Sequence, residues 1–522
     1  MDEENLSLLN NDVAECEGNL NSPDAYMGTV NDSRTPVEHN LSDGKCLDGK
    51  DTLVSPEVID IENESCEPKE DILDSSCEFM NSSLDSNCNI EIKILENIHQ
   101  NLQNDSSNIS VCSDPPHSNN DTKEHVHSSG IVEQPVNNIL SNEIYDFEHI
   151  PLQITGAWRE FQGKNQNNFT RGCKWAPDGS CILTCSDDKI LRIFNLPPQI
   201  WETSQWEDIS EMEAAVKIPE GEMIYDYCWY PFMNSADPST CCLASTSKGS
   251  PVHLWDGFTG ELRCSYRSYN HVDEIESARS LGFTADGQKL FCGFEKYIRI
   301  FDVDNPGREF EERKIFAKKS GQHGIISCFA FTSSNLTISA AGSYQKSIGI
   351  YAEPSGFLIS LLEGQKGGIT QLQFSPDGLL LYSGGRKDPE ILCWDVRNLG
   401  SVLYCMRRSC LTHQRMYFDL SKSGRYVVSG NYNGIISVWD TLKEPIAGSG
   451  DDFDVLEPIQ FYLAHEDCVN GISMHPFLPL LCSSSGQRKL PELLSEEEED
   501  MFASEFLKCD NSLRLWWTGK RS

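Results

Sequence analysis

The first 150 residues of this 522-residue chain have few basic and aromatic side chains and no tryptophan. They hold 32 acidic but 6 basic residues, and 4 of the 49 aromatic residues of the whole chain. A segment this polar and charged cannot bury enough apolar surface to offset the entropy lost on ordering. We therefore predict that residues 1–147 form a disordered acidic N-terminal region and that residues 148–522 form the folded domain.

Features of secreted, membrane-spanning and many catalytic proteins are also missing. The opening Met-Asp-Glu-Glu lacks the basic flank and apolar stretch of a secretory signal, and no run approaches the ~20 apolar residues that cross a bilayer. The sequence has no G-x-S-x-G, no GxxxxGK[ST] and no C-x-x-C. We accordingly expect no membrane partner, no cofactor, no metal site and no catalytic residue, so an enzyme is not predicted.

Cysteine is plentiful, at 21 residues, but its pattern does not suggest a disulfide framework. The number is odd, and many cysteines, such as Cys328 and Cys393, lie inside apolar strand-like runs. Buried reduced thiols of an intracellular protein fit this pattern better than the bridges of a secreted domain.

A three-part unit recurs from about residue 170. An alternating apolar strand ends in a turn, a second short strand leads to a Ser/Gly-rich break, and a third strand ends in an aromatic residue, usually followed by Asp. The clearest copy runs from Ile369 through Ser375-Pro376-Asp377-Gly378 to Trp394-Asp395. Seven third strands can be counted, and they end at Phe194, Trp255, Phe301, Tyr351, Trp394, Trp439 and Trp516.

Most steps between these aromatic residues are close to the ~40–45 residues of a WD repeat. Short, evenly spaced strands separated by such turns predict an all-β fold, a seven-bladed WD-repeat β-propeller of four-stranded blades. We assign the seven aromatic residues to the core, because each blade buries one between neighbouring sheets.

The seventh blade ends after its third strand, since only five residues follow Trp517. A strand within about 152–161 is available to complete it, which would close the ring and remove an exposed sheet edge. Two insertions, 197–222 and 488–511, interrupt blades one and seven, and the second contains the acidic run Ser495–Asp500.

Cations recur in loops that a propeller brings to one face. Six of the seven loops between second and third strands carry one, and loops entering first strands add others. Such a face is a candidate footprint for a phosphate backbone, with Tyr417 or Tyr432 available to stack on single-stranded bases. Surface loops also carry lysines without any such role, and nearby acids such as Asp187 and Asp388 balance some of them.

Several segments are not generic repeat sequence and resemble the telomerase Cajal body protein family. They are Gly172–Ser180, Leu290–Phe294, Phe316–Lys319, Gly324–Cys328, Arg386–Asp388, Gln414–Leu420 and Ser485–Arg488. The likeness spans about residues 150–520.

This resemblance implies an RNA-binding adapter that recognises the CAB box of small Cajal-body RNAs and of telomerase RNA. It implies delivery of these ribonucleoproteins to Cajal bodies, and support of telomerase assembly, trafficking and telomere maintenance. Implied partners are the telomerase ribonucleoprotein with its H/ACA core proteins, coilin, and a cytosolic chaperonin for folding. The implied location is the nucleus and its Cajal bodies, with telomere-associated and some cytoplasmic protein.

Combining the cationic loops with the family resemblance, we expect this face of the propeller to bind a short RNA loop. Phosphate contacts are expected from Lys318, Lys319, Arg386, Lys387 and Arg415, and base contacts from Gln414 and Tyr417. Each has a structural alternative: Arg415 and Tyr417 open a strand, and Arg386 has Asp388 as a possible pair.

Two further hypotheses remain at this stage. The alternative function is a purely protein-binding scaffold, for DNA repair or as a ubiquitin-ligase substrate receptor, because a propeller fold does not choose its ligand. In the N-terminal region, Ser22 and Ser55 each precede proline and are possible phosphorylation sites.

Overall fold

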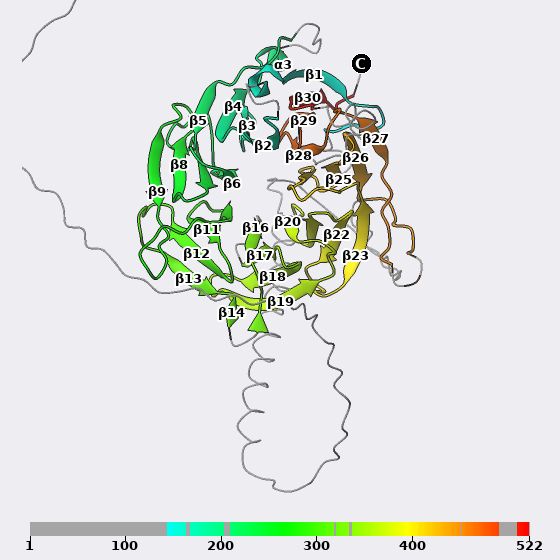
Figure 1. Cartoon of the computed structure of the whole chain (residues 1–522). Helices are drawn as coiled ribbons and strands as arrows, with labels where there is room; N and C mark the ends of the chain where they lie inside the picture. The colour runs from blue at the N-terminus through cyan, green and yellow to red at the C-terminus, as the bar shows by residue number, and fades with distance from the viewer. Residues whose placement is uncertain are drawn as a thin grey trace, which may run out of the picture. The chain divides into compact units, whose positions relative to one another are not determined.

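This computed structural model describes residues 144–162, 167–202, 209–317, 320–332, 337–448, 450, 452–489 and 509–520. Within them, seven four-stranded antiparallel sheets are arranged around a centre, as Figure 1 shows. The predicted all-β, seven-bladed WD-repeat propeller is therefore confirmed.

The strands follow one another blade by blade along the chain. Blades one to three are β2(Thr170–Trp175), β3(Cys181–Ser186), β4(Ile190–Asn195), β5(Val216–Pro219); β6(Ile224–Trp229), β7(Cys242–Ser247), β8(Val252–Asp256), β9(Leu262–Tyr266); and β10(Ser280–Phe283), β11(Lys289–Gly293), β12(Tyr297–Asp302), β13(Glu311–Lys314). Blades four and five are β16(Ile326–Phe331), β17(Ile338–Ser343), β18(Ser347–Ala352), β19(Phe357–Glu363); and β20(Ile369–Phe374), β21(Leu380–Gly385), β22(Glu390–Asp395), β23(Val402–Arg407). Blade six is β24(Phe418–Leu420), β25(Tyr426–Gly430), β26(Ile435–Asp440), β27(Gln460–Leu463).

Blade seven takes its four strands from both ends of the domain: β28(Val469–Met474), β29(Leu480–Ser485), β30(Leu513–Trp517) and β1(Leu152–Ala157). The strand that sequence reasoning proposed for closure is thus β1, which pairs antiparallel with β30 from Leu152↔Trp517 to Ala157↔Leu513. A short 3-10 helix, η1(Arg159–Phe161), follows β1 and buries Phe161. The ring is closed by this pairing, which leaves no unpaired edge on β30.

The start of the domain differs from the predicted boundary at residue 148. Tyr145 and Phe147 are buried between blades six and seven, in a cluster with Tyr426 and Trp516. The Tyr145 hydroxyl also donates to the carbonyl of His475 at 2.6 Å. The sequence composition assigned Tyr145 and Phe147 to the disordered region, because two aromatic residues hardly change the average composition of a polar stretch. The packed segment begins before residue 148.

Each of the seven repeat aromatics is the next-to-last residue of its third strand, as the pattern predicted. Six are buried, with Trp394 and Trp439 among the largest fully buried side chains, and Trp255 is half-buried. The described cysteines are free thiols and most are buried, as predicted. Burial raises the pKa of the Cys185 thiol to about 12, so the thiol is protonated at neutral pH.

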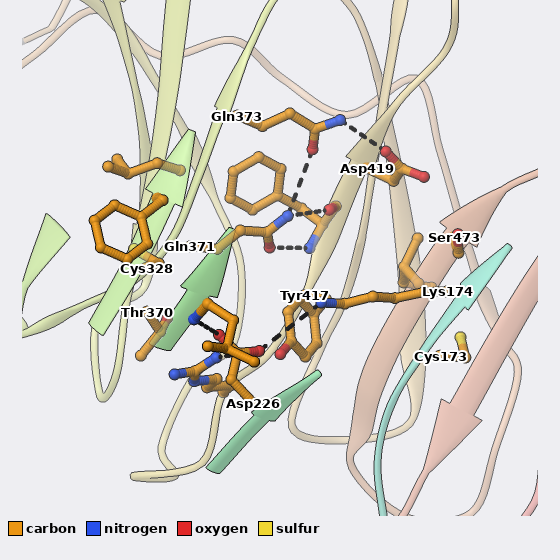
Figure 2. Close-up of a pocket in the computed structure, with 16 residues that line it drawn as sticks. Cys173, Lys174, Asp226, Cys328, Thr370, Gln371, Gln373, Tyr417, Asp419 and Ser473 are labelled. Carbon is orange, nitrogen blue, oxygen red and sulfur yellow. Dashed lines mark hydrogen bonds and ion pairs between the residues drawn. The ribbon is translucent and has the colours of Figure 1, made fainter. Parts of the chain in front are cut away.

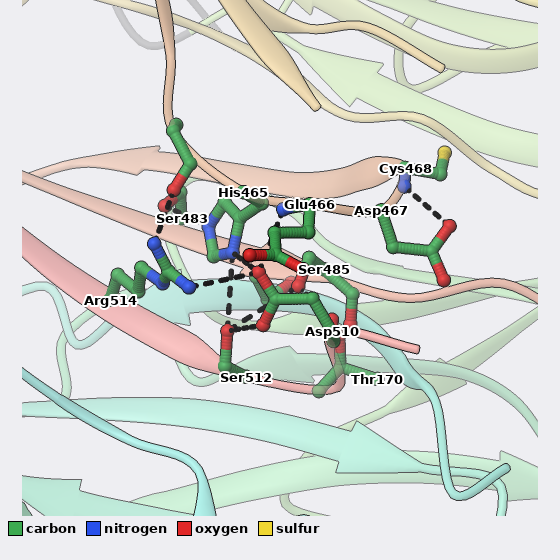
Figure 3. A network of polar contacts seen from close by, with 12 residues as sticks. Thr170, His465, Glu466, Asp467, Cys468, Ser483, Ser485, Asp510, Ser512 and Arg514 are labelled. Atoms are coloured by element: carbon green, nitrogen blue, oxygen red, sulfur yellow. Dashed lines mark hydrogen bonds and ion pairs between the residues drawn. The ribbon is translucent and has the colours of Figure 1, made fainter. Parts of the chain in front are cut away.

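Three of the tryptophans are held by polar relays that sequence reasoning did not foresee. In blade seven, Trp516 Nε1 donates to Ser483. The Ser483 hydroxyl contacts His465, and His465 faces Asp510 (Figure 3). Burial alone would raise the pKa of Asp510, but its hydrogen bonds with His465 and its neighbours hold it well below its usual value. In blade five, Trp394 reaches Asp388 through Ser383 and Gln365, and in blade two Trp255 reaches Glu220 through Ser245. These relays satisfy buried donors and fix blade geometry.

Blade six departs from this scheme at Arg408, which occupies the position of His465 and Gln365. Arg408 is buried and donates to the carbonyl of Met416 at 2.9 Å and to Ser429 at 3.0 Å. An arginine cannot accept a hydrogen bond, and Trp439 Nε1 has no partner among the described residues. Arg408 therefore braces the start of β24 instead of completing a relay.

The predicted insertions are only partly described. After β4, the short helix α3(Gln199–Glu202) precedes residues 203–208, which lie outside the described residues, and β5 then completes blade one. Residues 490–508, with the acidic run Ser495–Asp500, also lie outside, as do Ser22 and Ser55. Between blades three and four, β14(Phe316–Ala317) and β15(Ser320–Gly321) pair as a small hairpin.

Across the described ranges, no helix is long and apolar enough to cross a bilayer. In that same part of the chain, no group of three or more His, Cys, Asp or Glu side chains is placed to hold a metal ion.

Candidate functional site

The turns between second and third strands of blades one to six each contain a residue with a positive φ. Lys189, Lys296 and Lys346 lie directly before the third strand with φ of 68°, 67° and 69°, as does Gly434 of blade six, whereas Lys387 (φ 48°) and Gly249 (φ 74°) lie three residues before it. Residues other than glycine rarely adopt this left-handed conformation, which these tight turns require. Because antiparallel blades bring all these turns to one end, the four lysines lie on one rim, which we call the loop face.

Some of these cations are already paired. Lys189 Nζ lies 3.4 Å from Glu222, and Lys296 Nζ lies 3.2 Å from Glu295. Among the described residues, no carboxylate lies within 4 Å of the cationic groups of Lys346 or Lys387, both of which are exposed. The candidate lysines Lys318 and Lys319 lie outside the described residues.

Arg386 does not form the pair with Asp388 that the sequence left open. Its guanidinium carbon lies 4.2 Å from the ring centroid of Tyr344, a cation–π contact between blades five and four. The Asp388 carboxylate is buried and accepts instead from Gln365 at 3.0 Å and from the amide of Gly367 at 2.6 Å. The charge of Arg386 is therefore not neutralised by Asp388.

Gln414 and Arg488 are joined where the loops of blades six and seven meet. The Gln414 side chain accepts from the Arg488 amide at 2.6 Å and donates to the Gly486 carbonyl at 3.4 Å. Lys387 contributes to the same region, because its amide donates to the Thr412 carbonyl at 3.0 Å. The entry loop of blade six is thus fixed from both sides.

Arg415 points into the centre of the ring. Its guanidinium lies 3.1 Å from Asp226 of blade two and donates to the carbonyls of Arg279 at 3.2 Å and Ser327 at 2.8 Å, in blades three and four. The Arg415 side chain is 15% exposed and that of Asp226 is 6% exposed. Although burial alone would lower the pKa of Arg415, Asp226 raises it well above its usual value.

The first strands surround a central channel, whose inner part is a cavity of about 240 Å³ (Figure 2). Lys174 crosses it toward blade two, donating to the Tyr227 carbonyl at 2.6 Å, and its Nζ lies 5.6 Å from the centroid of the Tyr417 ring. Gly172 has a φ of 96°, and a Cβ there would lie 2.6 Å from the Tyr417 ring, so this close approach requires glycine. Figure 2 shows the Lys174 side chain reaching past Tyr417 toward Asp226, whose carboxylate lies 3.9 Å from Lys174 Nζ.

Farther in, Gln371 and Gln373 connect blade five to blade six. Gln371 donates to the Phe418 carbonyl at 2.7 Å, and Gln373 donates to Asp419 at 2.8 Å. Burial raises the pKa of Asp419 above its usual value. The channel is therefore lined by polar groups that are bonded to one another across blades.

At the loop face the channel opens into a second cavity of about 290 Å³, which we call the mouth pocket. Its walls include Phe169, Arg171, Tyr225, Tyr344, His413, Gln414, Tyr417 and Arg488. Asp226, Arg415 and Tyr417 line both cavities, so the ion pair of Asp226 and Arg415 lies where they meet. Three of the predicted site residues, Gln414, Arg415 and Tyr417, are thus brought together.

Sequence reasoning missed the other residues of the mouth pocket, chiefly Arg171, Tyr225 and Tyr344. Arg171 and Tyr225 occupy the second position of their first strands, beside an irregularity in the pairing with the next strand. Tabulating that position in every repeat would have placed them around one opening. Tyr344 had no such signal, because it lies in a turn and is distinguished only by its contact with Arg386.

Comparison with known proteins agrees with this architecture. The family model "WD domain, G-beta repeat" matches residues 159–195, 356–395 and 409–440. Telomerase Cajal body protein 1 of Mus musculus is 48% identical over 382 residues, which cover 72% of this chain and 70% of the relative. The protein of that name from Homo sapiens is 47% identical over 381 residues, covering 72% and 68%.

A more distant relative extends the likeness. The telomerase Cajal body protein 1 homolog of Drosophila melanogaster is 33% identical over 381 residues, covering 68% of this chain and 66% of the relative. Identity at this level, over most of both chains, exceeds what a shared propeller fold requires. The chain belongs to the telomerase Cajal body protein 1 family of WD-repeat proteins.

Proposed function

We propose that this chain is a non-catalytic RNA-binding adapter that recognises the CAB box of small Cajal-body RNAs and of telomerase RNA. It delivers these ribonucleoproteins to Cajal bodies and supports telomerase assembly, trafficking and telomere maintenance. The name that the relatives share, which refers to telomerase and to the Cajal body, supports the coarse part of this proposal.

The observation that supports RNA as the ligand is the composition of the loop face. Arg386 and Lys387 stand beside the tyrosine-lined mouth pocket, and among the residues that the structure describes no carboxylate lies within 4 Å of either cation. Single-stranded RNA is bound by this combination, because cations follow its phosphates and aromatic rings stack on its bases. The formal charge of the chain is −38, so binding depends on this local region.

Within the site, we assign phosphate contacts to Arg386 and Lys387, and base contacts to Gln414 and Tyr417. Lys318 and Lys319 stay in the proposal as phosphate contacts. Arg415 is moved from phosphate binding to positioning, because Asp226 neutralises it.

The wider proposal follows the family resemblance. Partners are the telomerase ribonucleoprotein with its H/ACA core proteins, coilin, and a cytosolic chaperonin during folding, with no membrane. The protein acts in the nucleus and its Cajal bodies, with telomere-associated and some cytoplasmic protein. Phosphorylation at Ser22 and Ser55 is part of this proposal and is decided by phosphopeptide mapping.

Charge reversal tests the proposed phosphate contacts. Binding of a CAB-box RNA hairpin to the full chain is measured against salt concentration for the wild type and for Arg386→Glu with Lys387→Glu. Each lost phosphate contact of a single strand lowers the salt slope by about 0.7, so the slope falls by about 1.4 and affinity drops. The control, Lys422→Glu with Lys443→Glu, makes the same charge change in turns at the other rim.

Unchanged affinity and slope in a folded Arg386/Lys387 variant would remove these two residues from the site. If the control pair weakened binding equally, the effect would be one of net charge and the loop face would lose its support.

The alternative, a purely protein-binding scaffold for DNA repair or for a ubiquitin ligase, has one observation in its favour. Phe461 and Leu463 on the outer strand β27 are 67% and 70% exposed, which suits a protein contact. Ultraviolet crosslinking in cells separates the two functions, because an RNA adapter yields discrete small RNAs and a protein scaffold yields none.

A further inference from the structure

The mouth pocket is built for a small, flat ligand. At about 290 Å³ it lies at the lower end of the ~300–1,000 Å³ of small-molecule sites. Three of its walls are tyrosines from different blades: Tyr225 of blade two, Tyr344 of blade four and Tyr417 of blade six. Rings from three directions offer stacking faces to a heterocycle that enters from the loop face.

Two arginines of the pocket, Arg171 and Arg415, are already paired with carboxylates. Arg171 lies 2.5 Å from Asp187, and Arg415 lies 3.1 Å from Asp226 at the inner end. An anion entering the pocket would meet the carboxylate of Asp226 and would have to compete with both ion pairs. The interior therefore suits an uncharged heterocycle better than a phosphate or a carboxylate.

The charges at the rim are different. Arg386 stands over Tyr344, and Arg488 is exposed at the opposite wall. Within the described part of the chain, neither has a carboxylate oxygen within 4 Å. Unneutralised cations outside and a neutral aromatic interior form the arrangement that a single nucleotide needs, with its phosphates at the rim and its base inside.

The polar groups of the pocket can read the edge of a base. His413 is exposed, and Gln414 is held in one orientation by its bonds to Arg488 and Gly486. Tyrosine hydroxyls both donate and accept, so the walls offer partners of either kind. Arg408 anchors this wall from behind through its bond to the Met416 carbonyl.

We propose that the mouth pocket takes one unpaired nucleobase of the bound RNA loop. The base stacks on Tyr344, whose other contact is Arg386, and its edge meets Gln414 and His413. The flanking phosphates lie against Arg386 and Arg488 at the rim. This inference rests on the proposed RNA-binding function and names the part of the RNA that the pocket holds.

The test combines abasic RNA with a pocket variant. A CAB-box RNA hairpin is made with each loop nucleotide in turn replaced by an abasic one, and binding to the full chain is measured by fluorescence anisotropy. Loss of a stacked base weakens binding about 10- to 100-fold at one position. In Tyr344→Leu, the intact hairpin binds about as weakly, and the abasic change at that position has no further effect.

The controls separate the pocket from its surroundings. Tyr269→Leu removes a tyrosine that also lies under an arginine, with Arg308 at 3.8 Å from its centroid, but that does not line the mouth pocket. It leaves the abasic profile of the wild type unchanged. The salt slope of Tyr344→Leu stays that of the wild type, because the phosphate contacts are kept, and melting curves verify that each variant is folded.

The outcomes distinguish the two proposals. If the wild type binds the hairpin no better than a hairpin with a scrambled loop, the proposed function fails. If it binds specifically but no abasic position couples to Tyr344, the pocket inference fails and the adapter function stands. Equal coupling to Tyr344 and to Tyr269 would also overturn the inference.

Discussion

The ion pair of Arg415 and Asp226 provides a test of whether Arg415 builds the propeller or binds its ligand. Sequence reasoning placed Arg415 among the phosphate contacts, but its guanidinium reaches across the channel to three other blades. Two single variants, Arg415→Met and Asp226→Asn, remove one charge each, and the double variant removes both.

The expected magnitudes follow from burial. Removing one member of a buried pair leaves the other charge without compensation and costs about 3–5 kcal/mol. Arg415→Met falls at the lower end, because Lys174 Nζ lies 3.9 Å from Asp226 and partly replaces the lost charge. Asp226→Asn falls at the upper end, because it leaves a buried guanidinium facing a neutral amide. The double variant is more stable than the sum of the two single losses predicts.

Unfolding by heat or urea measures these changes. A domain of this size has an unfolding entropy of about 0.8 kcal/mol/K, so a loss of about 3 kcal/mol lowers the melting temperature by about 4 °C. RNA affinity is measured on the same samples at a temperature where all are folded. If Arg415→Met kept the stability of the wild type but lost affinity and salt slope, Arg415 would be a phosphate contact and the structural role would be refuted.

Three further predictions concern the ring itself. His475 Nε2 donates to the Gly179 carbonyl while its Nδ1 accepts from two amides, and burial lowers the pKa of His475 from 6.5 to about 4. The stability that neutral His475 contributes is full above pH 6.5 and is lost toward pH 4, so the free energy of unfolding is about 2 kcal/mol lower at pH 5 than at pH 7.5. His475→Gln removes this part of the pH dependence in urea titrations. Ser383→Ala leaves Trp394 Nε1 and Gln365 without their shared partner and costs about 2–3 kcal/mol, whereas Ser401→Ala, at an exposed site, changes the melting temperature little. Deleting residues 1–150 removes Tyr145 and Phe147, whereas deleting residues 1–162 also removes β1 and the buried Phe161. We expect the longer deletion to lower the melting temperature far more than the shorter one. Equal melting temperatures would refute the closure by β1.

The blades could be predicted from the sequence because every blade must bury a large side chain from its third strand. A third strand such as β22(Glu390–Asp395) must bury its large side chain against a neighbouring sheet, as Trp394 does against blade four, so the aromatic recurs with the period of the repeat. The incomplete last blade predicted a strand from elsewhere, and β1 fills that place. The repeat pattern alone was therefore enough to predict the blades and the closing strand, without knowledge of individual contacts.

The site could be predicted only in part, because its residues do not repeat. The pattern places Arg415 in an entry loop, but the local backbone decides whether its side chain points toward solvent or into the channel, and Asp226 in a distant blade decides its charge balance. The contact of Arg386 with Tyr344 likewise joins two blades at turns that differ in every repeat. Composition counted both arginines as equal cations, and only their partners distinguish them.

Under the proposed function, that distinction explains how a chain with a formal charge of −38 binds a polyanion. At physiological salt, charges farther than about 8 Å away are largely screened, so an incoming phosphate responds to the rim beside it more than to the whole molecule. Arg415 and Arg171 are paired with acids and stabilise the mouth, while Arg386, stacked on Tyr344, and the exposed Arg488 have no carboxylate within 4 Å in the described part of the chain. The acidic remainder repels RNA that makes only general backbone contacts, so under the proposed function we expect stable binding to need a base in the pocket together with phosphates at the rim. We then expect selectivity for RNA, because few RNAs present an unpaired base and flanking phosphates in this arrangement. Adding cations to the rim should weaken that selectivity, because RNA that leaves the pocket empty would also bind.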